Sequence, residues 1–124
     1  MCKINLHPLI LFILISLFLL GGCSKYSDEV QANLIKLKKT KSCSGCDLTG
    51  IELIGFDLTG ADLSGANLTG ANFRRSDLTG ANLTDTNLTD ADLLGVNFTG
   101  ATLTNTILTG VKLSYTNING SENV

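Results

Sequence analysis

A five-residue unit repeats fifteen times between Cys46 and Gly120, without any insertion or deletion. Its commonest form is Ala-Asp/Asn-Leu-Thr-Gly. The third residue, called here the central residue, is Leu in twelve units and Phe or Ile in the other three. A period of five fits neither the helical period of about 3.6 residues nor the two-residue alternation of a long strand. The chain must therefore turn within every unit.

Side chains alternate along an extended chain, so the central residue and the first residue of each unit point the same way. The first residue is often small, as at Ala61, Ala66 and Ala71. The second residue, which points to solvent, is acidic or an amide in twelve units, and the fifth is Gly in ten. Glycine permits a corner with positive φ. The pattern predicts a narrow interior lined by one bulky and one small side chain from each unit.

The repeat resembles the pentapeptide-repeat family over 75 of the 124 residues. The resemblance implies an all-β solenoid: a right-handed, quadrilateral β-helix with one unit per side, in which residues four units apart stack on one face. Fifteen units would make about four coils, a post roughly 15 to 20 Å tall at the usual strand spacing. Asn67 would then neighbour Asn87. The strict phasing of the Leu residues argues against a disordered segment.

The N-terminal residues have the features of a secretory signal. Lys3 precedes an apolar run, Leu9 to Leu20, that is shorter than the roughly twenty residues a spanning helix needs. The run ends in Leu20-Gly21-Gly22-Cys23, which resembles the lipobox of bacterial lipoproteins. That resemblance implies cleavage before Cys23, a diacylglyceryl group on its sulfur and an acyl chain such as palmitate on its new N-terminus. Several acyl chains anchor a protein stably. An ordinary signal peptide or an uncleaved anchor is the alternative.

Between this signal and the repeat, a short α-helix is predicted to cover the open first coil, with Ser27 as its N-cap. Ile51 and Phe56 are bulky where later units have Ala, and we expect them beneath this cap. The apolar stripe of the predicted helix consists of Val30, Leu34, Ile35 and Leu37. The expected organisation is a signal peptide (1–22), a lipidated Cys with linker and capping helix (23–45), the β-helix (46–120) and a tail (121–124).

The tail is too short to form a second cap. We expect Tyr115 and Ile118 to plug the last coil, or two copies to meet there end to end, as some members of the family do. Charge divides along the chain: residues 24–45 carry five Lys against two acids, whereas residues 46–120 carry eight acids against Arg74, Arg75 and Lys112. We expect the basic helix to lie near anionic lipid and the acidic post to point away from the membrane.

Two cysteines remain once Cys2 is removed with the signal and Cys23 is lipidated. In an exported, oxidising compartment Cys43 and Cys46 are disulfide candidates, or Cys46 is simply buried. A c-type haem site would need His where Asp47 stands, and a structural zinc site needs about four ligands. The sequence therefore predicts no cofactor and no metal.

The sole histidine, His7, lies in the signal, which leaves no base for a Ser-His or Cys-His arrangement. Outward aspartates such as Asp57 and Asp77 are interpreted as solvated. We therefore expect a non-enzymatic, lipid-anchored protein of the bacterial cell envelope, on the inner or outer membrane and facing away from the cytoplasm, with a structural or protein-interaction role and no nucleic-acid partner.

Two other functions stay open. Some members of the family mimic DNA and act on a topoisomerase, but here the export signal, with Arg74 and Arg75 in the middle of the repeat, argues against that function. A periplasmic thiol oxidoreductase using Cys43 and Cys46 would need a βαβ context, which the sequence does not offer.

Overall fold

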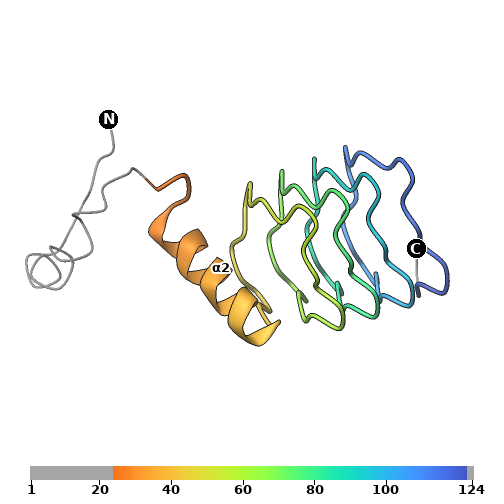
Figure 1. Ribbon diagram of the computed structural model, residues 1–124, viewed down its shortest axis with the longest axis horizontal. Helices are drawn as coiled ribbons and strands as arrows, with labels where there is room; N and C mark the ends of the chain where they lie inside the picture. The colour runs from red at the N-terminus through yellow and green to blue at the C-terminus, as the bar shows by residue number, and fades with distance from the viewer. Residues whose placement is uncertain (1–23, 123–124) are drawn as a thin grey trace, which may run out of the picture.

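The computed structural model describes residues 24–122, and its chain forms one helix followed by a stack of coils (Figure 1). The helix, α2, spans Asp28–Thr40 and lies across one end of the stack, while the C-terminal coil forms the opposite end. Each coil has four sides because each pair of bridged residues is twenty positions apart, which is four units. The predicted four-sided β-helix with an N-terminal helix is confirmed.

Coil-to-coil pairing within residues 24–122 consists of thirteen isolated parallel bridges rather than of longer strands. Every bridge joins second residues of stacked units, such as Asn67 with Asn87. The Leu83 N–H donates to the Thr102 carbonyl of the next coil at 2.8 Å, and the Asn82 N–H donates to the Ala61 carbonyl of the previous coil at 2.9 Å. In the inner coils, the main chain of each side is therefore hydrogen-bonded to the coil before it and to the coil after it.

Each corner is a tight turn of the main chain. The Ala66 N–H donates to the Leu63 carbonyl at 3.1 Å, and the residue between them at the corner, Gly65, has φ of 65°. A turn of this kind needs positive φ at its third residue, which explains why glycine recurs at the fifth position of the unit.

The interior is the predicted column of bulky and small side chains. Leu63, Leu83 and Ala81 are fully buried, as are most central and first residues up to Leu103. Two buried first residues are polar: the Ser76 hydroxyl donates to the Leu53 carbonyl and the Thr86 hydroxyl to the Leu63 carbonyl, each at 2.8 Å. Hydroxyl groups are accepted in this core because main-chain carbonyls of the previous coil satisfy them.

Helix α2 begins at the predicted N-cap, and a residue in the left-handed conformation ends it. The Ser27 hydroxyl accepts a hydrogen bond from the Val30 N–H at 3.3 Å. Lys41 closes the helix in the left-handed conformation with φ of 52°, and its N–H donates to the Leu37 carbonyl at 2.8 Å. No helix within residues 24–122 has both the length and the apolar composition to cross a bilayer.

The inner side of α2 covers the first coil. Val30 and Leu37 are buried and Leu34 is partly buried against the core. The Asn33 side-chain amide donates to the Asp47 carbonyl at 2.9 Å. As predicted, Ile51 is buried at this end and Phe56 is partly buried, with the Lys38 Nζ 5.2 Å from the centre of its ring.

Ile35 was predicted in the covering stripe, and that prediction is wrong, because its side chain is 61% exposed. It lies five residues after Val30, so at about 100° per residue it is turned well away from the buried side. A helix that rests on the flat end of a coil buries only a narrow stripe.

The coils extend slightly beyond the repeat at both ends. Ser42 already bridges to Asp62, and Cys43 takes the place of a buried central residue, so residues 41–45 form one further side before the predicted start at Cys46. At the other end Glu122 bridges to Thr102.

The last coil lacks the predicted plug. Tyr115 is 95% exposed because it stands at an outer corner, where its φ is 57°, and Ile118 is half exposed. Leu113 is also half exposed. Within residues 24–122 nothing covers this end of the stack, in contrast to the end beneath α2.

Candidate functional site

The outer faces carry one recurring polar arrangement. The side-chain oxygen of an Asp or Asn at the second position accepts hydrogen bonds from the fourth residue of its own unit: at Asn67 these come from the Thr69 N–H at 3.2 Å and the Thr69 hydroxyl at 2.7 Å. Asp and Asn side chains stabilise turns in this way. Both bonds occur at Asp47, Asp62, Asn67, Asp77, Asn82, Asn87 and Asn97.

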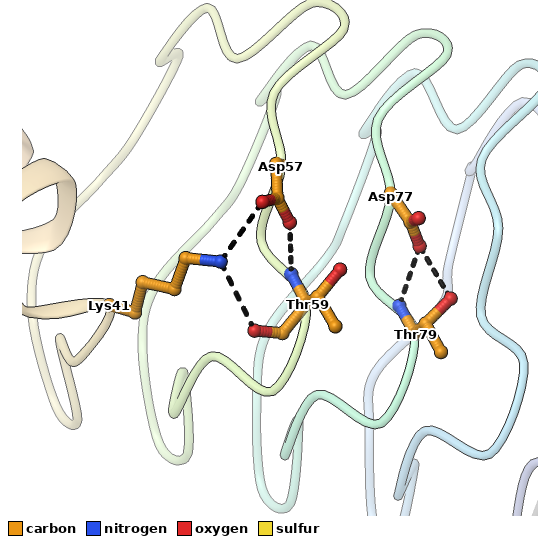
Figure 2. A network of polar contacts seen from close by, with 5 residues as sticks. All are labelled: Lys41, Asp57, Thr59, Asp77 and Thr79. Carbon is orange, nitrogen blue, oxygen red and sulfur yellow. Dashed lines mark hydrogen bonds and ion pairs between the residues drawn. The ribbon is translucent and has the colours of Figure 1, made fainter.

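These bonds refine the interpretation of the aspartates as solvated groups. Asp77 is partly buried and accepts both bonds from Thr79, as Figure 2 shows. The predicted stacking of Asp57 on Asp77 is present as a parallel bridge. The acidic and amide side chains therefore fix the backbone of each side, which makes the faces rigid.

Asp57 is also joined to the end of α2 (Figure 2). The Lys41 ammonium donates to the Asp57 carboxylate at 3.2 Å and to the Thr59 carbonyl at 3.4 Å, and the Thr59 N–H donates to the same carboxylate at 3.0 Å. The Lys41 side chain therefore points to the coil.

The hydrogen bonds lower the pKa of three carboxyl groups. The Thr59 N–H, then its hydroxyl and the Lys41 ammonium, lower the pKa of Asp57 to about 2. The Thr49 hydroxyl and N–H lower the pKa of Asp47, and the Ser64 hydroxyl and N–H lower that of Asp62. These donors favour the charged form of each carboxylate.

We expect Asp57→Asn to weaken the acid sensitivity of the fold. The folded pKa of Asp57 lies below its ordinary value of 3.8, so its contribution to stability is present above about pH 4 and is lost as the pH falls towards about 2. Asparagine can still accept from Thr59 but does not titrate. Urea unfolding midpoints of the two proteins should differ at pH 6 and converge at low pH, and a constant difference at every pH would contradict this assignment.

Cys43 and Cys46 are joined by a disulfide across the first corner, with their Cα atoms 5.3 Å apart. The Cys46 N–H donates to the Cys43 carbonyl at 3.2 Å, the same turn as at other corners. Cys43 is fully buried and Cys46 is 7% exposed. A substrate thiol therefore has little access to either sulfur, and the disulfide stands as a staple below α2.

Cys23, the predicted lipidation site, lies outside the described residues together with the predicted signal peptide. Within residues 24–122, no three His, Cys, Asp or Glu side chains gather in a way that could hold a metal ion. What the described part of the chain offers is a set of rigid outer faces.

Acidic residues are spread over all four sides. In the paired columns, Asp57 and Asp77 are the one instance of two acids in adjacent coils within residues 24–122. Elsewhere an acid neighbours a residue other than an acid, as Asp47 neighbours Asn67 and Asp92 neighbours Lys112. A continuous acidic stripe is therefore absent from the columns described here.

Comparison with models of known families matches residues 42–80 and 81–120 to pentapeptide repeats, in eight copies. No curated protein matches the chain. Among solved structures, the chain is similar to a pentapeptide repeat protein of the Arabidopsis thaliana thylakoid lumen, with 25% identity and a TM-score of 0.53, over 83% of this chain and 70% of that one.

Two further solved structures have lower TM-scores. HetL of Nostoc sp., a pentapeptide repeat protein involved in heterocyst differentiation regulation, is 28% identical with a TM-score of 0.45, over 65% of this chain and 46% of its own. QnrB1, a plasmid-mediated fluoroquinolone resistance protein, is 19% identical with a TM-score of 0.42, over 63% of this chain and 46% of its own.

Proposed function

The chain belongs to the pentapeptide-repeat family, and we propose that it is a non-enzymatic, lipid-anchored interaction protein of the bacterial cell envelope. The observation that carries this proposal is that the outward Asp and Asn side chains hydrogen-bond within their own units. Asp and Asn oxygens are engaged by the fourth residue of the same unit, as Asn67 is by Thr69. Such groups build a fixed surface rather than a reactive centre, and a fixed surface binds partners at a low entropic cost.

The predicted anchor is supported by the position of α2. Ser27 caps the helix only four positions after Cys23, so a lipid on Cys23 would hold the covered end of the β-helix close to the membrane. Lys36, Lys38 and Lys39 are exposed on this helix. Lysines near a membrane surface are attracted to anionic lipid headgroups.

We expect Cys23→Ser to release the protein from the membrane fraction and to abolish incorporation of labelled palmitate in the native host. Loss of the sulfur removes the diacylglyceryl site, and loss of several acyl chains leaves no stable anchor. Cys2→Ser is the matched control and should keep both the label and the membrane location, because Cys2 belongs to the segment that is removed. Membrane-bound Cys23→Ser protein, or loss of label from Cys2→Ser, would refute the anchor.

A DNA mimic acting on a topoisomerase is the second candidate, and the adjacent Asp57 and Asp77 are the feature that favours it. It ranks lower because, in the other columns within residues 24–122, every acid is bridged to a residue that is not an acid. The same fractionation separates the two functions: a cytosolic protein with an intact N-terminus would support the mimic. Reduction of insulin by the intact protein, lost in Cys43→Ser, would instead support a thiol oxidoreductase.

A homodimer through the C-terminal coil also belongs to this proposal. Ile107, Leu113 and Ile118 are each about half exposed there. Within residues 24–122 no further coil accepts from the Leu108, Leu113 and Ile118 N–H groups, and an uncovered solenoid end exposes such edges. Light scattering of the purified chain should give twice the protomer mass, and a monomer mass at every concentration would remove the dimer.

A further inference from the structure

One side of the β-helix departs from the pattern of the other three. It consists of residues 51–55, 71–75, 91–95 and 111–115, and we call it the variable face. On the other three sides the fourth residue of the unit is Ser or Thr in eleven of the twelve units from residue 41 to residue 120. On the variable face the fourth residues are Ile54, Arg74, Leu94 and Ser114.

The departure removes hydrogen bonds that the other sides have. Arg74 and Leu94 keep the main-chain bond to the preceding Asn72 and Asp92 oxygens, at 3.2 Å each. Neither can add the hydroxyl bond that Thr69 gives to Asn67. Positions that break a local rule of the fold without a structural gain are candidates for function.

The corner of this same side is also unusual. Arg75 and Tyr115 have φ of 59° and 57°, and they alternate with Gly55 and Gly95 along the corner. The non-glycine residues at other corners of the repeat are Asp and Asn, which tolerate the left-handed conformation better than Arg or Tyr. Strain of this kind gathers at functional positions.

The cations of the β-helix, together with several of its exposed apolar side chains, lie on the variable face. Arg74, Arg75 and Lys112 are all the cations of residues 46–120. Arg74 lies 3.6 Å from the Asp92 carboxylate, whereas within residues 24–122 no acidic side chain forms an ion pair with Arg75 or Lys112. Ile54 is 53% and Tyr115 95% exposed, and Leu94 is partly exposed.

We propose that the variable face binds a protein partner that presents a carboxylate to Arg75 and an apolar side chain to Ile54 and Leu94. Arginine and tyrosine beside exposed aliphatic groups are the composition of protein-binding hot spots. The unpaired Arg75 selects an acidic partner by charge complementarity. Glu52 and Asp92 on the same face already form ion pairs with Lys25 and Arg74, so they leave Arg75 available for the carboxylate of the partner. This inference rests on the proposed interaction function and names the surface and the chemistry of its partner.

Site-specific photocrosslinking of the full chain in its native host tests the proposal. The photoreactive residue p-benzoyl-phenylalanine replaces Ile54 or Leu94 on the variable face, and Thr69 or Thr89 at the same position of the unit on the adjacent side. We expect one discrete protein adduct from positions 54 and 94. Its yield should be at least about tenfold higher than the yield of any adduct from positions 69 and 89. The crosslinked peptide of the partner should contain Asp or Glu.

Substitutions of Arg75 separate binding from stability. Arg75→Glu should weaken the adduct at least about tenfold, as loss of a charge-assisted bond predicts. Replacing the mapped acid of the partner with Arg should restore the adduct of Arg75→Glu. Arg75→Gly should raise the thermal midpoint by about 4 °C, because glycine accepts positive φ, and should still lose the adduct. Asp90→Gly, at another corner with φ of 58°, should gain stability and keep the adduct.

Three results would overturn the proposal: equal adducts from both pairs of positions, an adduct that Arg75→Glu does not change, or an adduct with twice the mass of this chain, which would identify a second copy as the occupant. Adducts only from Thr69 and Thr89 would leave the interaction function standing and reject the variable face. Absence of adducts at all four positions would reject both.

Discussion

Leu83→Ala should lower the free energy of unfolding by about 3 kcal/mol, the largest effect expected of any single truncation considered for this chain. Leu83 is fully buried in the middle of the stack, where coils lie on both sides of it. The coils are tied together by main-chain bonds, so the cavity left by truncation cannot close readily. Urea unfolding followed by circular dichroism measures the change.

Leu113→Ala is the matched control for this prediction. Leu113 is the same residue at the same position of the unit, but it is 54% exposed on the last coil. Its truncation should lower the free energy of unfolding by about 1 kcal/mol or less, since less apolar surface is lost. Equal effects of the two substitutions would mean that the interior is not where the structure places it.

Leu37→Ala should lower the free energy of unfolding by about 2 to 3 kcal/mol, because Leu37 is 1% exposed and holds α2 on the first coil. Loosening of α2 would uncover the core and the unpaired edge of that coil. The variant should therefore also show increased association in light scattering. Unfolding in urea and light scattering together test the capping role of α2.

Ile35→Ala gives the control on the same helix. Ile35 is 61% exposed, so its truncation should change the free energy of unfolding by no more than about 0.5 kcal/mol and leave association unchanged. A large effect of Ile35→Ala with a small effect of Leu37→Ala would mean that the other side of α2 faces the coil.

The repeat was sufficient to predict the fold because its period and its apolar positions are both local and strict. The buried Leu63 and Leu83, the bridge between Asn67 and Asn87 and the cap at Ser27 follow from single units or from one short segment. Each of these rests on alternation of side chains or on capping chemistry, which depend on few neighbours.

Features that depend on the ends of the stack were not predictable in this way. Ile35 and Leu37 are both apolar, and only the line of contact between a helix and a flat coil end decides which one is buried. Tyr115 was expected to cover the last coil, but its place at a corner turns it outward. The side formed by residues 41–45 carried a signal that was missed: Cys43 and Gly45 stand at the central and corner positions of one more unit.

For the outer surface, the sequence predicted only that acidic and amide side chains point to solvent. The Asp-x-Thr and Asn-x-Thr spacing is visible in the sequence, yet its role in fixing each side is a matter of side-chain geometry. The variable face could have been found by writing the repeat in rows of twenty residues, which aligns Ile54, Arg74 and Leu94. Within single units these three residues are separate exceptions to the Ser or Thr of the fourth position.

Scalar couplings across hydrogen bonds, measured by nuclear magnetic resonance on the isotope-labelled full chain in detergent, test the coil register most directly. We predict couplings from the Leu83 N–H to the Thr102 carbonyl and from the Leu68 N–H to the Asn87 carbonyl, the pairs that lie 2.8 Å apart. Their absence, or couplings from these two N–H groups to carbonyls of other residues, would contradict a β-helix with four units to the coil.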